Sequence, residues 1–323
     1  MRFNVQLSVT ATTACLLLAG CGQSPPVPEA AMTPHAVVAF PNTMQLAAGS
    51  SAQLQAQVND VEEQPIGGAS IVFRSKHPDI IGVSQDGVVS ALGPVGVSAV
   101  QIASGVRVVE VPVRIVAGAG ALLEATQAPA ATTQAGASLG DVTVQLRDQF
   151  NNPVPGAALS WRLDDHGGLI ESASATTAAD GTGSARWTAA TSTGPHTLEV
   201  RSGDLPPLVL TTSVGAGIPV AIKLSSDPLQ PGASATVGDT LQIRAQVVDQ
   251  YDNGVTGVEL QLDASGACEA NATLQQTDET GTTPASSSEV GDNGNCVIVA
   301  KTTQPPTLEA QITVPVQSAA KRK

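Results

Sequence analysis

Residues 164–168, Asp-Asp-His-Gly-Gly, form the densest polar group in the chain and the first place to look for chemistry. Neighbouring carboxylates and an imidazole can bind a cation or transfer a proton. Polar residues followed by two glycines are equally typical of a hairpin loop. We favour the loop.

No other group of residues forms a catalytic motif. The four histidines, His35, His77, His166 and His196, each stand alone in the local sequence. The chain contains no HExxH zinc motif, no GxSxG nucleophile motif and no phosphate-binding glycine loop. Ser160 and Ser184 are expected on solvent-facing strand positions without a base beside them. We therefore expect no enzyme activity, no catalytic residue, no bound metal and no cofactor.

The first residues predict export and a lipid anchor. Arg2 precedes a short hydrophobic region, Leu7 to Leu18, and Leu18-Ala19-Gly20-Cys21 follows at once. This pattern resembles the lipobox of bacterial lipoproteins, which implies that residues 1–20 are a signal peptide and that Cys21 becomes the lipid-carrying first residue. The alternative is an ordinary secretory signal in which Cys21 is incidental.

The residues after Cys21 indicate where the protein lies. In a bacterium with two membranes, Gly22 after the lipidated cysteine favours the outer membrane over the inner one. Residues 21–34 are rich in proline and are expected to form a semi-rigid tether. No other run of eighteen apolar residues occurs, so we expect the lipid to be the only anchor.

Two further cysteines, Cys268 and Cys296, are the pair left for an exported domain. They are a candidate disulfide, and closing such a loop stabilises by about 3 to 4 kcal/mol in the chain-entropy model. Two free or metal-bound thiols are the alternative. The segment between them is rich in Gly, Ser, Thr and Asp, and we expect a long loop there.

A nine-residue phrase occurs three times and predicts a turn between strands. The copies are Asp60 to Gly68 (DVEEQPIGG), Asp148 to Gly156 (DQFNNPVPG) and Asp249 to Gly257 (DQYDNGVTG). The leading Asp can accept hydrogen bonds from the backbone ahead, and the closing Gly tolerates positive φ. The turn residues singled out are Asp60, Gly68, Asp148, Asn152, Pro153, Gly156, Asp249, Asn253 and Gly257. A calcium site at Asp148 and Asn151, or at Asp249 and Asp252, is the alternative to a plain Asx turn.

The strand after each turn has apolar residues at alternate positions. Residues 69–73, 157–161 and 258–262 align without gaps, and their third and fifth members are apolar each time. This is the pattern of a strand with one face toward a core. Phe73, Trp161 and Trp187 are the expected core aromatics.

The spacing of the phrase predicts three modules of roughly one sandwich domain each. The first covers 35–117 and resembles the group 2 bacterial immunoglobulin-like domain through Ser75, Asp79-Ile80, Val83-Ser84 and Gly87 to Ala91. The second covers 118–216 and resembles the group 1 domain of the intimin and invasin family. Its matching residues are Asp148, Asn152-Pro153-Val154, Gly156, Trp161, Asp180-Gly181 and Gly194.

The third module, 217–317, follows the group 1 plan less closely. It matches through Gly238-Asp239, Asp249, Asn253, Gly257 and Asp292-Asn293-Gly294. It departs at Gly254, where the second module has Pro153, and in its longer cysteine-bracketed segment. Residues 318–323 are a short basic tail. The resemblance implies an all-β protein, with three tandem immunoglobulin-like β-sandwiches after a lipoprotein signal peptide.

Composition narrows the range of partners. A formal net charge of −13 makes nucleic acid a poor partner, because phosphate recognition needs clustered Lys and Arg. Few aromatic residues are present, which argues against a sugar-stacking surface. Phe150 and Tyr251 both stand second after the turn Asp. Each is expected either to wedge between neighbouring modules or to lie over its own sandwich end.

These features favour a lipid-anchored stalk of immunoglobulin-like modules that acts in structural or adhesive presentation at the cell surface. In intimin and invasin relatives such modules mostly serve as spacers, although the fold alone fixes no role. The alternatives are a periplasm-facing scaffold or accessory subunit, and an accessory module of a hydrolase system. The expected partners are the membrane, through the lipid, and a protein or glycan that the sequence does not identify. The third module, farthest from Cys21 in the sequence, is the expected adhesive tip.

Overall fold

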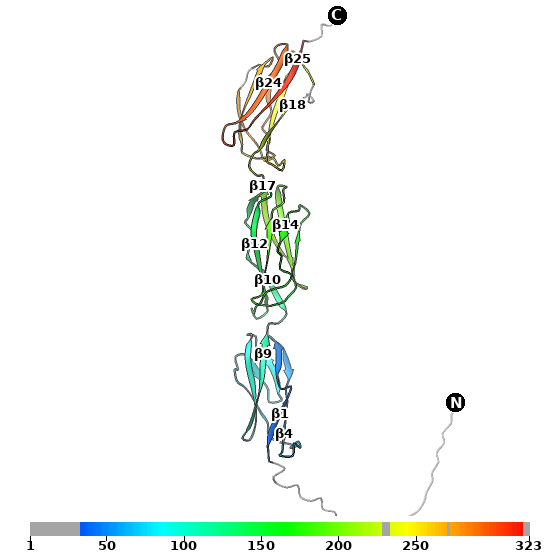
Figure 1. Ribbon diagram of the computed structural model, residues 1–323, viewed down its shortest axis with the longest axis vertical. Coiled ribbons are helices and arrows are strands. Elements are labelled where there is room, and N and C mark those ends of the chain that lie inside the picture. The colour runs from blue at the N-terminus through cyan, green and yellow to red at the C-terminus, as the bar shows by residue number, and fades with distance from the viewer. Residues whose placement is uncertain (1–32, 228–232, 270–271, 319–323) are drawn as a thin grey trace, which may run out of the picture. The chain divides into compact units, whose positions relative to one another are not determined.

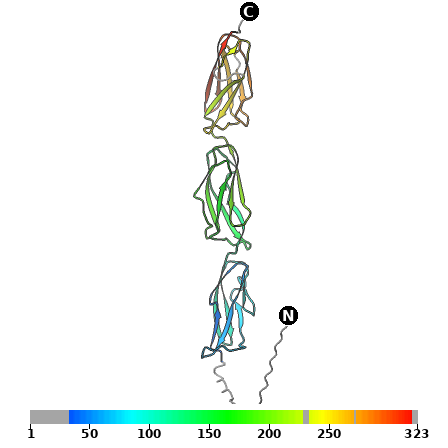
Figure 2. The ribbon, with the colours of Figure 1, turned by 90° about the vertical axis from the view of Figure 1, so that its right-hand side faces the viewer.

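Every regular element in the described part of the chain is a β-strand (Figures 1 and 2). The computed structural model describes residues 33–227, 233–269 and 272–318. Within these ranges no helix has the length and apolar character needed to cross a membrane. The predicted signal peptide, Cys21, nearly all of the tether and the basic tail beyond residue 318 lie outside the described residues.

The first sandwich contains three sheets. Their strand orders are β1-β4, β2-β9-β8-β5 and β3-β7-β6. The strands are β1 (Ala36–Phe40), β2 (Met44–Ala47), β3 (Ser51–Gln53), β4 (Gln55–Asn59), β5 (Val72–Ser75), β6 (Ile81–Val83), β7 (Val88–Ala91), β8 (Gly96–Ser104) and β9 (Arg107–Val116).

The second sandwich consists of two four-stranded sheets, β10-β12-β15-β14 and β11-β17-β16-β13. The strands are β10 (Gly120–Gln127), β11 (Thr132–Gln134), β12 (Ser138–Asp148), β13 (Ser160–Leu163), β14 (Leu169–Glu171), β15 (Thr182–Thr188), β16 (Gly194–Arg201) and β17 (Leu208–Gly215). β11 and β17 run parallel, whereas the other pairs of known register are antiparallel.

The third sandwich repeats this plan with one strand fewer in its first sheet and one strand more in its second. The sheets are β18-β20-β23 and β19-β25-β24-β21-β22, and β19 pairs parallel with β25. The strands are β18 (Ala221–Asp227), β19 (Ala235–Thr236), β20 (Thr240–Val248), β21 (Glu259–Gly266), β22 (Thr273–Gln276), β23 (Ser286–Glu289), β24 (Gly294–Thr302) and β25 (Glu309–Gln317). The expectation of a long loop between the cysteines was wrong in part, because β22 and β23 form there and pair with β21 and β20.

Each sandwich has a core of its own between its sheets. In the second, Val142, Val144 and Trp187 from one sheet pack with Leu198 and Val200 from the other. In the third, residues of β20 pack with residues of β24 and β25. Alternating apolar residues place one side chain in two on the inner face of a strand, so the period read from the sequence produces these cores.

By their contacts, the residues form two compact units. The smaller unit contains Ser51–Ser90, Val97–Arg114 and the described residues up to Gln45. The larger unit contains Ile115 onward together with Leu46–Ser50 and Ala91–Gly96, two segments of the first sandwich that consist of loop residues and adjoining strand ends. The contacts described below lie within the larger unit or within one sandwich.

Candidate functional site: the Asp turns and the loops they contact

The three copies of the repeated phrase, here called the Asp turns, share one backbone arrangement. The N–H of the first residue of each turn donates to the carbonyl of the fifth residue, at 2.9 to 3.0 Å. The fourth residue donates to the carbonyl of the first, and the seventh donates to the strand before the turn. The fourth residues, Glu63, Asn151 and Asp252, have φ of 61°, 65° and 72°. The turn is therefore built by the same hydrogen bonds whatever the sequence between its Asp and its last Gly.

Asp148 holds the second turn together with a nearly buried carboxylate. Its Oδ1 accepts the N–H groups of Phe150 and Asn152, both at 2.9 Å. Its Oδ2 accepts the N–H of Gly118 at 2.8 Å and the side-chain amide of Asn152 at 2.9 Å. Gly118 lies where the chain enters the second sandwich, so one carboxylate fixes both the turn and the connecting segment.

Asp249 makes the same set of bonds in the third turn. Its Oδ1 accepts the N–H groups of Tyr251 and Asn253 at 2.8 and 2.9 Å. Its Oδ2 accepts the N–H of Gly217 at 2.7 Å and the side-chain amide of Asn253 at 2.9 Å. Charged acceptors form the stronger class of hydrogen bond, which suits a position where the chain passes between sandwiches.

Both carboxyls ionise more readily than an ordinary aspartic acid. Burial alone raises the pKa of Asp148, but hydrogen bonds from Asn152, Gly118 and Phe150 outweigh burial and lower the pKa overall. The pKa of Asp249 is lowered in the same way, by Asn253, Gly217 and Tyr251 acting against burial. Donors directed at the charged form explain the direction of both changes.

The asparagines extend the turns to a preceding loop. The side-chain amide of Asn152 donates to the carbonyl of Gly93 at 2.8 Å, and its Oδ1 accepts the N–H of Val95 at 3.2 Å. The side-chain amide of Asn253 donates to the carbonyl of Thr191 at 2.7 Å. Gly93 and Val95 belong to the loop segment Ala91–Gly96 of the larger unit.

The aromatic rings pack on glycines of these loops and of neighbouring ones. A Cβ added to Gly93 would lie 2.8 Å from Phe150 Cδ1, and one added to Gly49 would lie 2.7 Å from Phe150 Cε2. A Cβ added to Gly136 would lie 2.8 Å from Tyr251 Cζ. These glycines leave room that another residue would fill. Of the two expectations for Phe150 and Tyr251, contact with the preceding sandwich is the arrangement observed.

The first Asp turn lacks the residues that make these contacts. Asp60 accepts the N–H groups of Glu62 and Gln64 at 2.8 and 2.9 Å, as in the other turns. Glu62 occupies the aromatic position and Gln64 the asparagine position. The three turns therefore share the same backbone hydrogen bonds. The second and third turns also have an aromatic residue and an asparagine that contact loops of the preceding sandwich.

A calcium site at these turns finds no support in the geometry. The carboxylate oxygens of Asp148 and Asp249 are directed at N–H donors. The other two candidate calcium ligands are engaged elsewhere. Asn151 accepts a hydrogen bond from Arg147, and Asp252 forms an ion pair with Lys223. The described residues contain no group of three His, Cys, Asp or Glu side chains placed to bind a metal. The geometry is that of an Asx turn.

Residues 164–168 form the tight connection between β13 and β14. Asp164 accepts the N–H of His166 at 3.0 Å and the N–H of Thr197 at 2.5 Å. The His166 ring stacks on His196, with centroids 5.3 Å apart. His196 is completely buried, and neither of its ring nitrogens has a hydrogen-bond partner in the described structure. No sequence pattern predicts that burial.

Three recesses in the described part of the chain each contain a single ionisable group. The recess at Leu146 and Ser202–Leu205, of about 420 Å³, is lined by one such group, Asp204. Recesses of about 370 and 250 Å³ contain Arg74 and Glu259, respectively, as their only ionisable groups. A general acid and base, or a nucleophile with its base, would require two groups in one place.

The expected core aromatics are buried to different degrees. Phe73 and Trp187 are buried, with 7% and 0% of their surface exposed. Trp161 is only partly buried and packs on the edge of the second core, with its indole N–H donating to the carbonyl of Ser174 at 2.9 Å. Its strand, β13, is the edge strand of its sheet.

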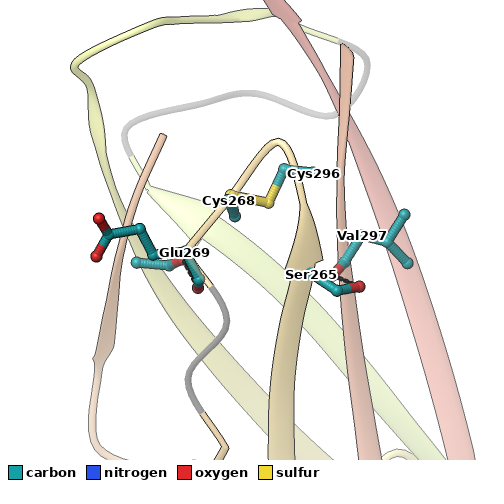
Figure 3. Close-up of a disulfide and its surroundings, with 6 residues drawn as sticks. Ser265, Cys268, Glu269, Cys296 and Val297 are labelled. Carbon is teal, nitrogen blue, oxygen red and sulfur yellow. Dashed lines mark hydrogen bonds between the residues drawn. A yellow bond between two sulfur atoms is a disulfide. The ribbon is translucent and has the colours of Figure 1, made fainter. Parts of the chain in front are cut away.

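Cys268 and Cys296 form a disulfide (Figure 3). Cys296 lies on β24, and Cys268 lies two residues beyond the end of β21. Both cysteines are buried in the core cluster of the third sandwich with Val290 and Ile298. Nearby, Ser265 Oγ lies 3.4 Å from the carbonyl of Val297, across the β21–β24 pair. The bond therefore joins neighbouring strands at one end of the sandwich.

No family model and no curated protein matches this chain. Its arrangement is similar to solved structures at low identity. FdeC, an Escherichia coli adhesin, is 18% identical over 90% of this chain and 98% of its own, with a TM-score of 0.47. Invasin, a bacterial integrin-binding protein, is 17% identical over 88% of this chain and 60% of its own, with a TM-score of 0.45. A three-domain titin fragment gives 9% identity, 86% and 96% coverage, and a TM-score of 0.44. Similarity at this level assigns neither a family nor a function.

Proposed function

We propose that this chain is a lipid-anchored, non-catalytic stalk at the bacterial cell surface, and that its immunoglobulin-like modules present the third module away from the membrane. The observation that carries this proposal is the pair of Asp turns at positions 148 and 249. Each joins the start of one sandwich to the loops of the sandwich before it through a charged hydrogen-bond network, an asparagine and an aromatic ring. A stalk requires such joints and no reacting groups.

The charge of the chain agrees with this role. At a net charge of −13 the modules are repelled by anionic lipid head groups, which favours their standing off the membrane. Nucleic acid is a poor partner for the same reason. The partner of the presented module is a protein or a glycan, and adhesion is the use that such presentation serves.

The anchor itself is tested at Cys21. Palmitate labelling and membrane fractionation should show a labelled, membrane-bound protein, and Cys21→Ala should remove both the label and the membrane association. Cys268→Ser with Cys296→Ser is the matched control, because it changes cysteines without changing the lipobox. A Cys21→Ala protein that still carries lipid would contradict the anchor.

The position of the stalk is tested by protease treatment of intact cells that carry a tag on the third module. Loss of the tag while a periplasmic control protein survives would support surface presentation. A surface-exposed protein without its third module should then attach less well to host tissue or to other cells. Unchanged attachment would contradict the adhesive role.

Protection of the tag until lysis would favour the second candidate, a periplasm-facing scaffold. Its specific support is the pair of open sheet edges at β5 and β13, which are end strands in the first and second sandwiches. An open edge can add a strand from a partner. Crosslinking to envelope proteins would then identify that partner.

A further inference from the structure

The third sandwich contains a loop like those on which Phe150 and Tyr251 pack in the first two sandwiches. We call this loop the receiving loop. In each sandwich the backbone N–H of the residue just before the loop donates to the carbonyl of the last residue of the final strand, at 2.8 to 3.0 Å. These pairs are Ala48 to Val116, Ala135 to Gly215, and Val237 to Gln317. The next residue is a glycine with positive φ each time, Gly49 at 78°, Gly136 at 72° and Gly238 at 97°. Gly238 is therefore the counterpart of the two glycines on which Phe150 and Tyr251 pack.

The second part of the receiving loop is present as well. Gly136 donates its N–H to the carbonyl of Ala190, and Gly238 donates to the carbonyl of Val290, both at 2.9 Å. Thr191, which follows Ala190, supplies the carbonyl that Asn253 binds. Gly291 follows Val290 in the same way and is exposed. We call Gly238 and the segment 290–292 the third socket.

The third socket differs from the other two in being empty of described side chains. A Cβ built on Gly238 would meet no atom within 4 Å, whereas one built on Gly136 would collide with the Tyr251 ring. Gly238 thus has the positive φ and the missing side chain of Gly49 and Gly136, although no aromatic ring of the described residues packs on it. In the filled sockets the same two features admit the ring.

We propose that the third socket is a docking site for an immunoglobulin-like module of a partner protein, one whose Asp turn carries an aromatic residue two positions after the Asp and an asparagine two positions further on. Both filled sockets hold this kind of turn, which identifies the occupant by its chemistry. The ring covers the glycine, and the asparagine amide binds the carbonyl after Val290.

A second copy of this chain does not supply that turn. Its Phe150 and Tyr251 turns are engaged with its own loops. Its first turn has Glu62 and Gln64 at the two contact positions. Glu62 would also approach Asp239, beside the socket, and Asp292, within it, and like charges disfavour that contact. The inference rests on the proposed role as a presenting stalk, but its test uses purified protein and no cells, so the two can fail separately.

The test attaches a matching turn in place of the partner. Residues 117–216 are appended directly after Gln317 of the chain that starts at residue 22. Because Gln317 is the counterpart of Val116, the spacing of the natural joint is kept. The appended copy presents its own Phe150 and Asn152 to the third socket. The matched control carries Phe150→Glu and Asn152→Gln in the appended copy only, which reproduces the first turn.

The readout is the NMR signal of the Gly238 Hα protons in glycine-labelled protein. A ring stacked on this glycine should move these protons upfield relative to the chain without the added module, in the direction that the Tyr251 ring is expected to move those of Gly136. The control should leave them in place. Signals from the appended Gly181 report whether the added sandwich is folded.

An unmoved Gly238 signal beside a folded appended module would overturn the proposal, and so would equal shifts in the two fusions. A second fusion, with residues 216–317 appended at the same point, presents Tyr251 and Asn253 instead. It gives an independent result if the first added sandwich does not fold. The same upfield shift is expected, and its absence counts equally against the socket.

Discussion

The side-chain amide of Asn253 lies 2.7 Å from the carbonyl oxygen of Thr191, and the same nitrogen lies 2.9 Å from Asp249 Oδ2. An amide NH2 has two hydrogens, so one can serve the residue's own turn while the other reaches the preceding sandwich. Asn152 repeats this relationship with Asp148 and Gly93. The joint is therefore built from a short side chain whose two donors are both committed.

Replacing the two contact residues of the third turn with those of the first should loosen the joint. The change is Tyr251→Glu with Asn253→Gln. The turn should persist, because Asp60 forms it beside Glu62 and Gln64. ¹⁵N relaxation should give one rotational correlation time for the second and third sandwiches in the natural protein and two distinct times in the variant. Glu62→Ala is the control, and unchanged relaxation in the double variant would contradict the role of the joint.

Asp249→Ala should destabilise the third sandwich by about 2 to 4 kcal/mol, because partly buried N–H donors lose a charged acceptor. Urea unfolding followed by a probe in that sandwich measures the loss. Asp252→Asn, in the same turn, removes only an exposed ion pair with Lys223 and should change stability by less than about 0.5 kcal/mol. Equal effects of the two substitutions would show that the Asp249 carboxylate is dispensable.

Acid should weaken both joints. The pKa values of Asp148 and Asp249 are lowered in the folded protein, so each group binds its proton less tightly there than in the unfolded chain. Their stabilisation is present above the unfolded-state pKa, near 4, and is lost as pH falls through the lower folded values. Unfolding free energies between pH 7 and pH 2 should show this fall. In Asp148→Asn with Asp249→Asn the fall should be smaller, and an identical pH profile would refute the assignment.

Gly254→Pro, which copies Pro153 of the second module, should not be tolerated in the third. Gly254 lies against the backbone of residues 280 and 281, and a Cβ on Gly281 would lie 2.5 Å from the Gly254 Cα. An added side chain must displace backbone, and we expect a loss of at least about 2 kcal/mol. Gly291→Ala, with open space at its Cβ, is the control in thermal or urea unfolding. Similar stability of the two variants would argue against this close approach.

The disulfide should be present in the mature protein and should stabilise the third sandwich. Intact mass with and without reductant should differ by two hydrogens. Since the bond joins cysteines 28 positions apart, its removal should cost about 3 to 4 kcal/mol. The second sandwich, which has no cysteine, provides the internal control in the same unfolding experiment. An unchanged mass would mean that the thiols are free.

The sequence predicts the turns well because their chemistry is local. Asp followed by its own N–H donors, and glycine at positive φ, need only the residues of the turn itself. The receiving side is different, because Gly49 and Gly136 are ordinary loop glycines until a ring from another sandwich reaches them. The sequence alone therefore does not decide whether Phe150 and Tyr251 wedge between neighbouring modules or lie over their own sandwich ends.

Strand alternation predicted inward positions but not the depth of burial. Trp161 is on an apolar position and still lies at the rim, because β13 is an edge strand. His196 occupies an alternate position of β16 and is fully enclosed, although imidazole gives no apolar signal. β22 forms in a polar segment because β21 offers it an unpaired edge. The burial of Trp161, the burial of His196 and the formation of β22 all depend on which strands become neighbours. A local sequence pattern does not predict those neighbours.

The parallel strand pairs help these sandwiches to resist mechanical load. A pull applied to the two ends of a sandwich draws β11 against β17, or β19 against β25, along their own length, so their hydrogen bonds are strained together rather than one after another. The second sandwich holds three residue pairs in this arrangement and the third holds two, so the third should yield at the lower force. After the third sandwich yields, the disulfide between Cys268 and Cys296 prevents the residues between them from extending. Under tension, the third sandwich would thus extend first and stop short of its full length.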